Sequence, residues 1–167
     1  WLGGGGDDIV AGGAGRDLIC GDLGDESSLG GLGADAPGRA GQDGDRIFGN
    51  RGNDRINAGA GEDVVYAGKD NDIVSAGKNN DTVFGDQGQD TLNGDLGDDV
   101  LVGGNFEQFS QESAENGADL MFGGGGNDLL LGNLGDDTLV GNTGNDSIRG
   151  GQQEDILFGG AGNDLLR

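Results

Sequence analysis

One nine-residue unit recurs along most of this chain and constrains its fold more than any other feature. Residues 123–149 contain three units in unbroken register, GGGGNDLLL, GNLGDDTLV and GNTGNDSIR. Glycine takes the first place of each unit, and Gly126, Gly135 and Gly144 take the fourth. The sixth place is aspartate and the eighth is a large aliphatic residue. A period of this length predicts a solenoid in which every unit repeats one local structure.

The register extends along the sequence of 167 residues, apart from two interruptions, and gives about fifteen units, each with aspartate in the sixth place. These aspartates are Asp8, Asp17, Asp45, Asp54, Asp63, Asp72, Asp81, Asp90, Asp99, Asp119, Asp128, Asp137, Asp146, Asp155 and Asp164. The eighth places are apolar throughout, from Val10 to Leu166. We therefore expect one domain over residues 1–167. Trp1 and Leu2 fit the last two places of an earlier unit, so we expect a fragment of a longer protein.

The residue types within a unit predict a turn followed by a short strand. The first six places are rich in Gly, Asn and Asp, which favour tight turns and positive φ. Where the second place of a unit is not glycine, it holds aspartate or asparagine, which tolerate positive φ. These residues are Asp22, Asn50, Asp86, Asp95, Asn133 and Asn142. The last three places suit a strand whose middle residue points inward. Two turns and two strands make a coil of eighteen residues, and stacked coils make an all-β solenoid of parallel strands.

The unit resembles the nonapeptide GGxGxDxUx of the repeat-in-toxin (RTX, hemolysin-type) proteins, in which U is a large aliphatic residue. The closest matches are GGAGRDLIC at 12–20, GGGGNDLLL at 123–131 and GGAGNDLLR at 159–167. The resemblance covers every unit outside two interruptions. It implies a parallel β-roll with calcium ions between same-side turns of successive coils. It also implies a bacterial protein exported by the one-step (type I) route.

The resemblance further implies which atoms bind each ion. In the family, an ion takes the sixth-place aspartates of units i and i+2, with backbone carbonyls from places two and four of one turn and one and three of the other. Carried over, Asp128 pairs with Asp146, and the carbonyl ligands are those of Gly124, Gly126, Gly141 and Thr143. On the other side Asp137 pairs with Asp155, and the carbonyl ligands are those of Asn133, Gly135, Gly150 and Gln152. Such an all-oxygen shell suits Ca²⁺.

Several units depart from this pattern. The fourth-place glycine is replaced by Asp70, Asn79 and Gln153, and the first by Ala58, Ala67 and Ala76. A carbonyl ligand survives such changes, but we expect altered turns and less regular sites around residues 67–84. Gln153 is the least natural of these residues, because it lacks the local hydrogen bonding that lets Asn adopt positive φ.

The net charge of −22 indicates that cations stabilise the stack. Same-side aspartates of stacked coils would lie ~5 Å apart, and two such charges repel by ~3 kcal/mol at an effective dielectric near 20. A dozen such repulsions would exceed a typical domain stability of ~5–15 kcal/mol. About eleven divalent ions would neutralise the formal charge. We therefore expect multiple calcium ions, roughly ten, and a fold that depends on them.

Two inserts interrupt the array. The first, residues 25–43, is polar and glycine-rich and holds the only proline, Pro37. It is interpreted as a surface loop, with a calcium-tied loop as the alternative. The second, residues 106–116, holds Phe106 and Phe109 and contains no Gly or Pro, which favours a turn or two of helix. Its aromatic pair is expected to cover an apolar face of the roll, with ligand binding as the alternative.

Ninth-place side chains point outward, and those of one sheet predict an aromatic ladder. Phe48, Tyr66 and Phe84 are eighteen residues apart and should stack on neighbouring strands. Cross-strand stabilisation is one interpretation of this ladder. Docking of another domain of the parent protein is a second, and binding of surface polysaccharide is a third.

The leading functional prediction is a calcium-binding structural module, outside the cell or on its surface, that aids secretion, folding or positioning of a larger protein. The alternative is an adhesion or carbohydrate-binding module that uses an outer β-face. Catalysis is not expected, because metal ligation accounts for the paired carboxylates and histidine is absent. Nine Lys and Arg residues form no patch for nucleic acid, and no stretch is long and apolar enough for a transmembrane segment.

Overall fold

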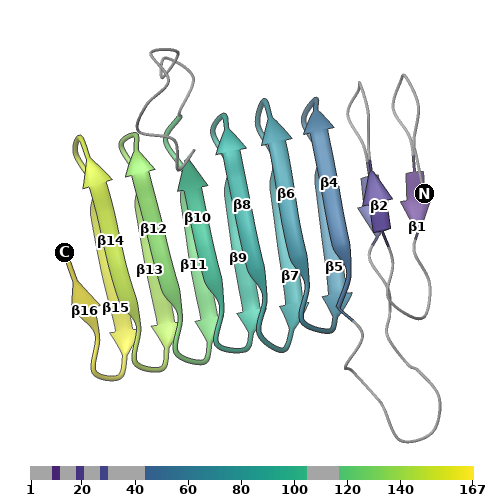
Figure 1. Ribbon diagram of the computed structural model, residues 1–167. Coiled ribbons are helices and arrows are strands. Elements are labelled where there is room, and N and C mark those ends of the chain that lie inside the picture. The colour runs from purple at the N-terminus through teal and green to yellow at the C-terminus, as the bar shows by residue number, and fades with distance from the viewer. Residues whose placement is uncertain (1–8, 12–17, 21–26, 30–43, 105–116) are drawn as a thin grey trace, which may run out of the picture.

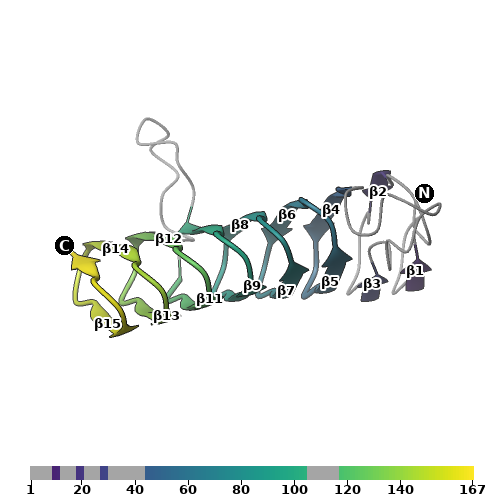
Figure 2. The same ribbon diagram turned by 90° about the horizontal axis from the view of Figure 1, so that it is seen from below.

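The chain forms two parallel β-sheets, seen face-on in Figure 1, and the two sheets face each other across a narrow interior. The computed structural model describes residues 9–11, 18–20, 27–29, 44–104 and 117–167. Successive strands alternate between the two sheets, and turns connect the sheets at both edges (Figure 2). Each pair of strands therefore makes one coil, and the coils stack along a single axis.

The odd-numbered strands form the first sheet in chain order. They are β1 (Ile9–Ala11), β3 (Ser27–Leu29), β5 (Arg55–Ala60), β7 (Ile73–Lys78), β9 (Thr91–Leu96), β11 (Leu120–Gly125), β13 (Thr138–Thr143) and β15 (Ile156–Ala161). The even-numbered strands form the second sheet. They are β2 (Leu18–Cys20), β4 (Arg46–Arg51), β6 (Val64–Lys69), β8 (Thr82–Gln87), β10 (Val100–Gly104), β12 (Leu129–Leu134), β14 (Ser147–Gln152) and β16 (Leu165–Leu166).

Pairing between strands follows the nine-residue register. Val65 on β6 pairs with Val83 on β8, and Val74 on β7 pairs with Leu92 on β9, so eighth places meet eighth places. Partners in these ladders are eighteen residues apart, which is one coil. The predicted all-β parallel solenoid with eighteen-residue coils is therefore confirmed.

The structure corrects the predicted first insert at its N-terminal side. Residues 27–29, inside the predicted insert 25–43, form β3, in which Ser28 pairs with Val10 and with Ile56. By sequence register, β3 takes the last three places of a nine-residue unit whose sixth place is Glu26 and whose eighth is Ser28. Glutamate and serine hide this unit from a pattern that requires aspartate and an aliphatic residue. Residues 30–43, including Pro37, lie outside the described residues.

The second interruption leaves the stacking on either side in register. Leu101 pairs with Leu130 and Leu92 with Met121, so partners here are 29 residues apart rather than eighteen. β10 ends at Gly104, and the description resumes at Gly117. Residues 106–116, with the expected helix and its two phenylalanines, lie outside the described part of the chain.

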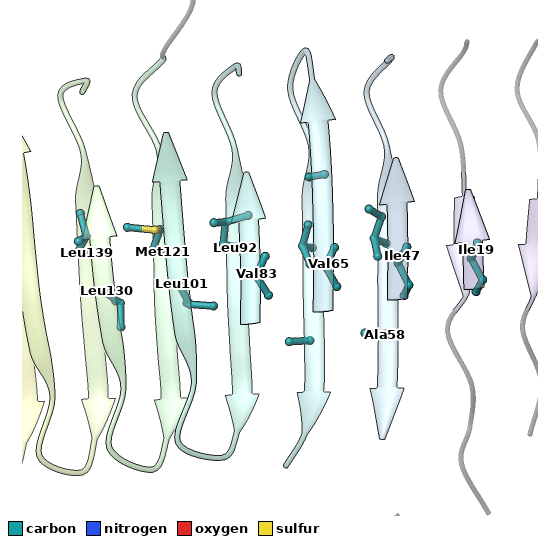
Figure 3. Packing of buried hydrophobic residues seen from close by; sticks show 14 of the residues in the cluster. Ile19, Ile47, Ala58, Val65, Val83, Leu92, Leu101, Met121, Leu130 and Leu139 are labelled. Atoms are coloured by element: carbon teal, nitrogen blue, oxygen red, sulfur yellow. The ribbon is translucent and has the colours of Figure 1, made fainter. Parts of the chain in front are cut away.

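The eighth-place side chains form the core, in a row along the inside of the two sheets (Figure 3). Ile47, Val65, Leu101 and Leu130 are all fully buried. Each of these units contributes one large apolar side chain, worth about 1.5–3 kcal/mol when fully buried. Such a core is narrow, so polar groups fill the turns that close each coil.

Positive φ occurs at the second places that the sequence marks for it. Glycine is replaced there by Asn50, Asp86, Asp95, Asn133 and Asn142, with φ between 69° and 80°. Asp22, the remaining residue of this group, lies outside the described residues. Asparagine and aspartate are the side chains that tolerate this conformation, so the predicted turn chemistry is confirmed.

The fourth-place substitutions keep the turn conformation, although the sequence predicts that they alter it. Asp70, Asn79 and Gln153 have φ values of 81°, 73° and 82°. The side chain of Gln153 makes a bond that the sequence does not suggest, because its Oε1 accepts the Gly135 N–H at 2.8 Å. This bond reaches the neighbouring coil, so it links two coils while the residue occupies the strained conformation.

The predicted aromatic ladder is present on the outer face of the second sheet. The ring centroids of Phe48 and Tyr66 are 5.0 Å apart with planes inclined by 5°. Those of Tyr66 and Phe84 are 4.9 Å apart with planes inclined by 9°. Both faces of Tyr66 are therefore turned toward a neighbouring ring.

Candidate metal centres

The sixth-place aspartates lie buried in the turns that join the two sheets. Those with 1–3% exposure are Asp45, Asp54, Asp63, Asp72, Asp81, Asp90, Asp99, Asp119, Asp128, Asp137 and Asp146. Asp155 and Asp164 are half-buried. Asp8 and Asp17 lie outside the described residues. Burial of so many carboxylates is unusual, because isolated charges are rarely removed from water.

One oxygen of each buried carboxylate links successive coils. The backbone N–H of Asp128 donates to Oδ1 of Asp146 at 2.9 Å, and that of Asp119 donates to Oδ1 of Asp137 at 2.8 Å. The same bond recurs along both edges of the roll, from the Asp45–Asp63 pair to the Asp146–Asp164 pair. Each coil therefore places its carboxylate directly against the backbone of the coil before it.

The second oxygen of these carboxylates is buried without a hydrogen-bond partner. Oδ2 atoms in this state belong to Asp63, Asp72, Asp81, Asp90, Asp99, Asp119, Asp128, Asp137 and Asp146. A buried polar atom without a partner costs about 1–3 kcal/mol, and more when it is charged. A row of such oxygens at one period fits a cationic partner better than it fits isolated defects.

The electrostatics of the turns also favour a cation. Burial raises the pKa of Asp72, Asp81 and Asp119 to about 8. Hydrogen bonds from the neighbouring backbone lower these pKa values in part, and the adjacent aspartates raise them further. Burial likewise raises the pKa of Asp99 to about 7 and that of Asp137 to about 6. A positive ion beside these carboxyls would favour the ionised form and reverse the shift.

First-place glycines leave open the space on which the oxygens converge. A Cβ built on Gly132 would overlap Oδ2 of Asp137 and lie 2.5 Å from the carbonyl oxygen of Gly150. A Cβ on Gly123 would overlap Oδ2 of Asp128 and lie 2.8 Å from the Gly141 carbonyl oxygen. A carboxylate oxygen of one coil and a carbonyl oxygen of the next thus meet where a side chain is missing. We call this space between same-side turns an intercoil gap.

Further carbonyl groups lie between the turns of the same two coils. The Gly126 carbonyl points at Gly144, where a Cβ would overlap it. From the next coil, the Thr143 carbonyl points back and accepts the Gly126 N–H at 2.9 Å, while Thr143 Oγ1 donates to the Gly124 carbonyl at 3.2 Å. The carbonyl groups predicted around Asp128 and Asp146, those of Gly124, Gly126, Gly141 and Thr143, therefore all contact the neighbouring coil of the same pair.

The equivalent set around Asp137 and Asp155 is less regular. The Gly150 carbonyl faces Gly132, and the Asn133 carbonyl faces Gly151, where a Cβ would overlap it. Gly135 is buried and its N–H is taken by Gln153, while Gln152 is exposed at the end of β14. On this side the Gly135 N–H thus bonds to the Gln153 side chain, whereas the equivalent Gly126 N–H bonds to the Thr143 carbonyl.

The donor set fits a hard divalent cation. Within the described residues, no group of three or more His, Cys, Asp or Glu side chains gathers to hold a metal. Beside the first-place glycines, a carboxylate oxygen of one coil instead lies near a backbone carbonyl oxygen of the next, as Asp128 Oδ2 and the Gly141 carbonyl do beside Gly123. Ca²⁺ accepts such all-oxygen shells with flexible geometry, whereas zinc and copper prefer nitrogen or sulfur ligands.

A second ladder lies beside the carboxylates and was not predicted from the sequence. Fifth-place side chains accept the backbone N–H of the fifth place one coil on, as from Asn145 to Asn127 and from Asn163 to Asn145, both at 2.9 Å. The bond recurs where Asp98 meets Asn80 and where Asn127 meets Asp98. Asn and Asp at these positions are the signal that could have revealed it.

The fold and the gaps define a class of protein, a parallel β-solenoid whose turns bring carboxylate and carbonyl oxygens together between coils. The profile of the RTX calcium-binding nonapeptide repeat (4 copies) matches residues 2–36, 39–74, 75–106, 113–130 and 131–166. These segments cover most of the chain, so the chain belongs to the RTX calcium-binding repeat family. No curated protein matches the chain.

Proposed function

We propose that this chain is a structural module that folds on binding multiple extracellular calcium ions, roughly ten, in its intercoil gaps. The observation that carries the proposal is the row of buried Oδ2 atoms without partners, from Asp63 to Asp146. Membership of a calcium-binding repeat family agrees with it. Each ion would be held by two sixth-place carboxylates and by carbonyls such as those of Gly124, Gly126, Gly141 and Thr143.

The magnitudes support coupling of the fold to calcium. Extracellular calcium modules typically bind with Kd of ~10⁻⁴–10⁻³ M. At ten times Kd, each site adds ~1.4 kcal/mol to the stability of the state that binds. Ten such sites would contribute ~14 kcal/mol, which is comparable with the whole stability of a typical domain. The presence or absence of calcium would then decide whether the coils stack.

This affinity range suits a protein that meets calcium outside the cell. RTX repeat proteins are typically secreted or associated with the cell surface. Within the described residues, no helix is long and apolar enough to cross a membrane. We propose that the module stays unstacked until it reaches millimolar calcium, and that its folding there aids the secretion, folding or positioning of a larger protein.

Neither catalysis nor adhesion has comparable support. RTX repeats are structural and generally not enzymatic, and the paired carboxylates are accounted for as ligands. For polysaccharide binding, an aromatic face open to the sugar would be needed. Both faces of Tyr66 are turned toward Phe48 and Phe84, which favours cross-strand stabilisation as the role of the ladder.

A calcium titration of the whole chain tests the proposal. Circular dichroism should show little β-structure in chelator and a cooperative gain in millimolar Ca²⁺, while equilibrium dialysis counts about ten ions per chain. Magnesium at equal concentration is the control, because it demands a smaller octahedral shell and should not substitute. A chain with full β-structure in excess chelator at pH 7.5, and no bound ions in millimolar calcium, would contradict the proposal.

A further inference from the structure

Three consecutive units differ from their neighbours at the first place. Ala58, Ala67 and Ala76 occupy it, and all three are fully buried. At the other first places that the structure describes from residue 49 onward, the residue is glycine. The methyl groups therefore lie at the position where the glycine units leave space beside Oδ2 of the sixth-place aspartate.

The glycine units show what a methyl group at this position must displace. A Cβ on Gly132, Gly141 or Gly159 would overlap the Oδ2 atom of the aspartate in the same unit. Neither Gly132 nor Gly141 has a positive φ, so the backbone there accepts alanine. Glycine is thus needed at the first place because it has no side chain to fill the space between the oxygens, and not because the backbone conformation requires it. In an alanine unit the carboxylate or the facing carbonyl has to shift.

The alanines coincide with a change in charge balance. Residues 49–84, which we call the alanine segment, hold four cations beside six acidic residues. The cations are Arg51, Arg55, Lys69 and Lys78. Residues 85–104 and 117–148, which we call the glycine segment, hold ten acidic residues and no Lys or Arg. The alanine segment therefore carries much of its own counter-charge, and the glycine segment carries none.

Two apolar features add cohesion to the same coils. The stacked rings of Phe48, Tyr66 and Phe84 lie along strands β4, β6 and β8, which span the alanine segment. The three alanine methyl groups extend the buried core toward the turns. Contacts of both kinds stabilise stacked coils without a metal ion.

We propose that the first-place residue sets the calcium demand of each intercoil gap, so that the alanine segment takes fewer or more weakly bound ions and stays stacked at calcium concentrations too low for the glycine segment. The proposal rests on calcium binding in the gaps, as proposed above. Three gaps are affected, those that open beside Asp63, Asp72 and Asp81. The alanine segment is then a calcium-sparing centre on which calcium-dependent coils are built.

Reciprocal substitutions test this assignment. In the triple variant Ala58→Gly/Ala67→Gly/Ala76→Gly, the three gaps lose the methyl groups. Equilibrium dialysis at saturating Ca²⁺ should then count up to three more ions per chain, or the Kd of the weakest sites should fall about tenfold. In Gly132→Ala/Gly141→Ala the count should fall by up to two. Both variants change only first places whose backbone suits either residue.

Hydrogen exchange locates the difference along the chain. In the wild-type chain at sub-saturating calcium, amides of β6 to β8 should remain protected while those of β11 to β14 exchange. Unchanged ion counts and affinities in both variants, or equal loss of protection in the two segments, would overturn the inference while leaving calcium binding intact. If the triple variant does not fold, the Gly132→Ala/Gly141→Ala count decides alone. A wild-type chain that binds no calcium would instead overturn the proposed function.

Discussion

The carboxylate of Asp137 has one oxygen in use and one without a partner. Its Oδ1 accepts the backbone N–H of Asp119 at 2.8 Å, and its Oδ2 is buried with no hydrogen-bond partner. The first oxygen fixes the side chain against the preceding coil, so the second is held in position before any ion arrives. One hydrogen-bonded oxygen and one buried oxygen without a partner distinguish the sixth-place aspartates from the many exposed acidic residues of the chain.

Asp137→Asn should therefore reduce calcium binding far more than a change of charge alone. Asparagine keeps an oxygen for the Asp119 N–H but places an amide NH₂ toward the gap, where it cannot ligate. We expect one or two fewer ions per chain and a loss of about 3 kcal/mol in calcium-dependent stability if two sites at ten times Kd are removed. Calcium titration followed by chemical denaturation measures both.

The matched control is the neighbouring residue. Asp136 carries the same charge but is exposed, and its Oδ1 accepts the Glu154 N–H at 3.1 Å. Asp136→Asn should bind as many ions as the wild-type chain. Equal losses in the two variants would mean that net charge, rather than ligation by Asp137, controls binding.

The repeat pattern predicts the fold well because each place in the unit has one dominant physical role. Eighth-place residues such as Leu130 are buried, and Asn133 adopts positive φ where glycine is missing. The pattern fails to identify a unit that lacks the sixth-place aspartate and the eighth-place aliphatic residue. Glu26 and Ser28 conceal the unit that contains β3, because pairing of backbone groups, rather than side-chain type, places that strand.

The candidate site is only partly predictable from the sequence. Spacing identifies which aspartates share a side, and the family suggests the carbonyls. The division between Oδ1 and Oδ2 depends on how far one coil lies from the next, and no spacing gives that distance. The Gln153 bond to Gly135 likewise could not be predicted, because glutamine does not favour the positive φ that Gln153 adopts, so nothing in its residue type indicates this conformation or this bond.

The aromatic ladder should stabilise the roll without affecting its ion content. Tyr66→Ser removes two ring contacts, each worth about 0.5–1.5 kcal/mol beyond area burial, so we expect a loss of about 1–3 kcal/mol. Asn57→Ser, a ninth-place change on the other sheet, is the control and should have a small effect. Thermal unfolding in saturating calcium compares them. Fewer ions bound to the Tyr66 variant would argue against a purely structural ladder.

The fifth-place ladder should contribute a smaller amount of stability. Asn145→Ala removes the acceptor of the Asn163 N–H and the bond from Asn145 Nδ2 to Asn127 at 3.0 Å. These bonds are exposed, so we expect a loss of about 1 kcal/mol. Glu154→Ala is the control, because its own backbone bond to Asp136 is kept. Denaturation midpoints at saturating calcium measure the difference, and a change in the ion count of Asn145→Ala would contradict this separation of roles.

The raised carboxyl pKa values predict opposite pH dependences with and without calcium. Burial raises the pKa of Asp72, Asp81 and Asp119 from 3.8 to about 8. A folded-state pKa above the unfolded value adds stability that is complete below the unfolded pKa and is lost as pH rises through the folded one. The calcium-free chain should therefore hold more β-structure at pH 5 than at pH 8, measured by circular dichroism in calcium-stripped buffer.

With calcium the trend reverses, because protons compete with the ion for the same oxygens and binding strengthens toward pH 8. Light scattering at pH 5 controls for association near the isoelectric point of about 4.1. A calcium-free chain that gains β-structure from pH 5 to pH 8 would show that these carboxyls are ionised in the folded state without a cation.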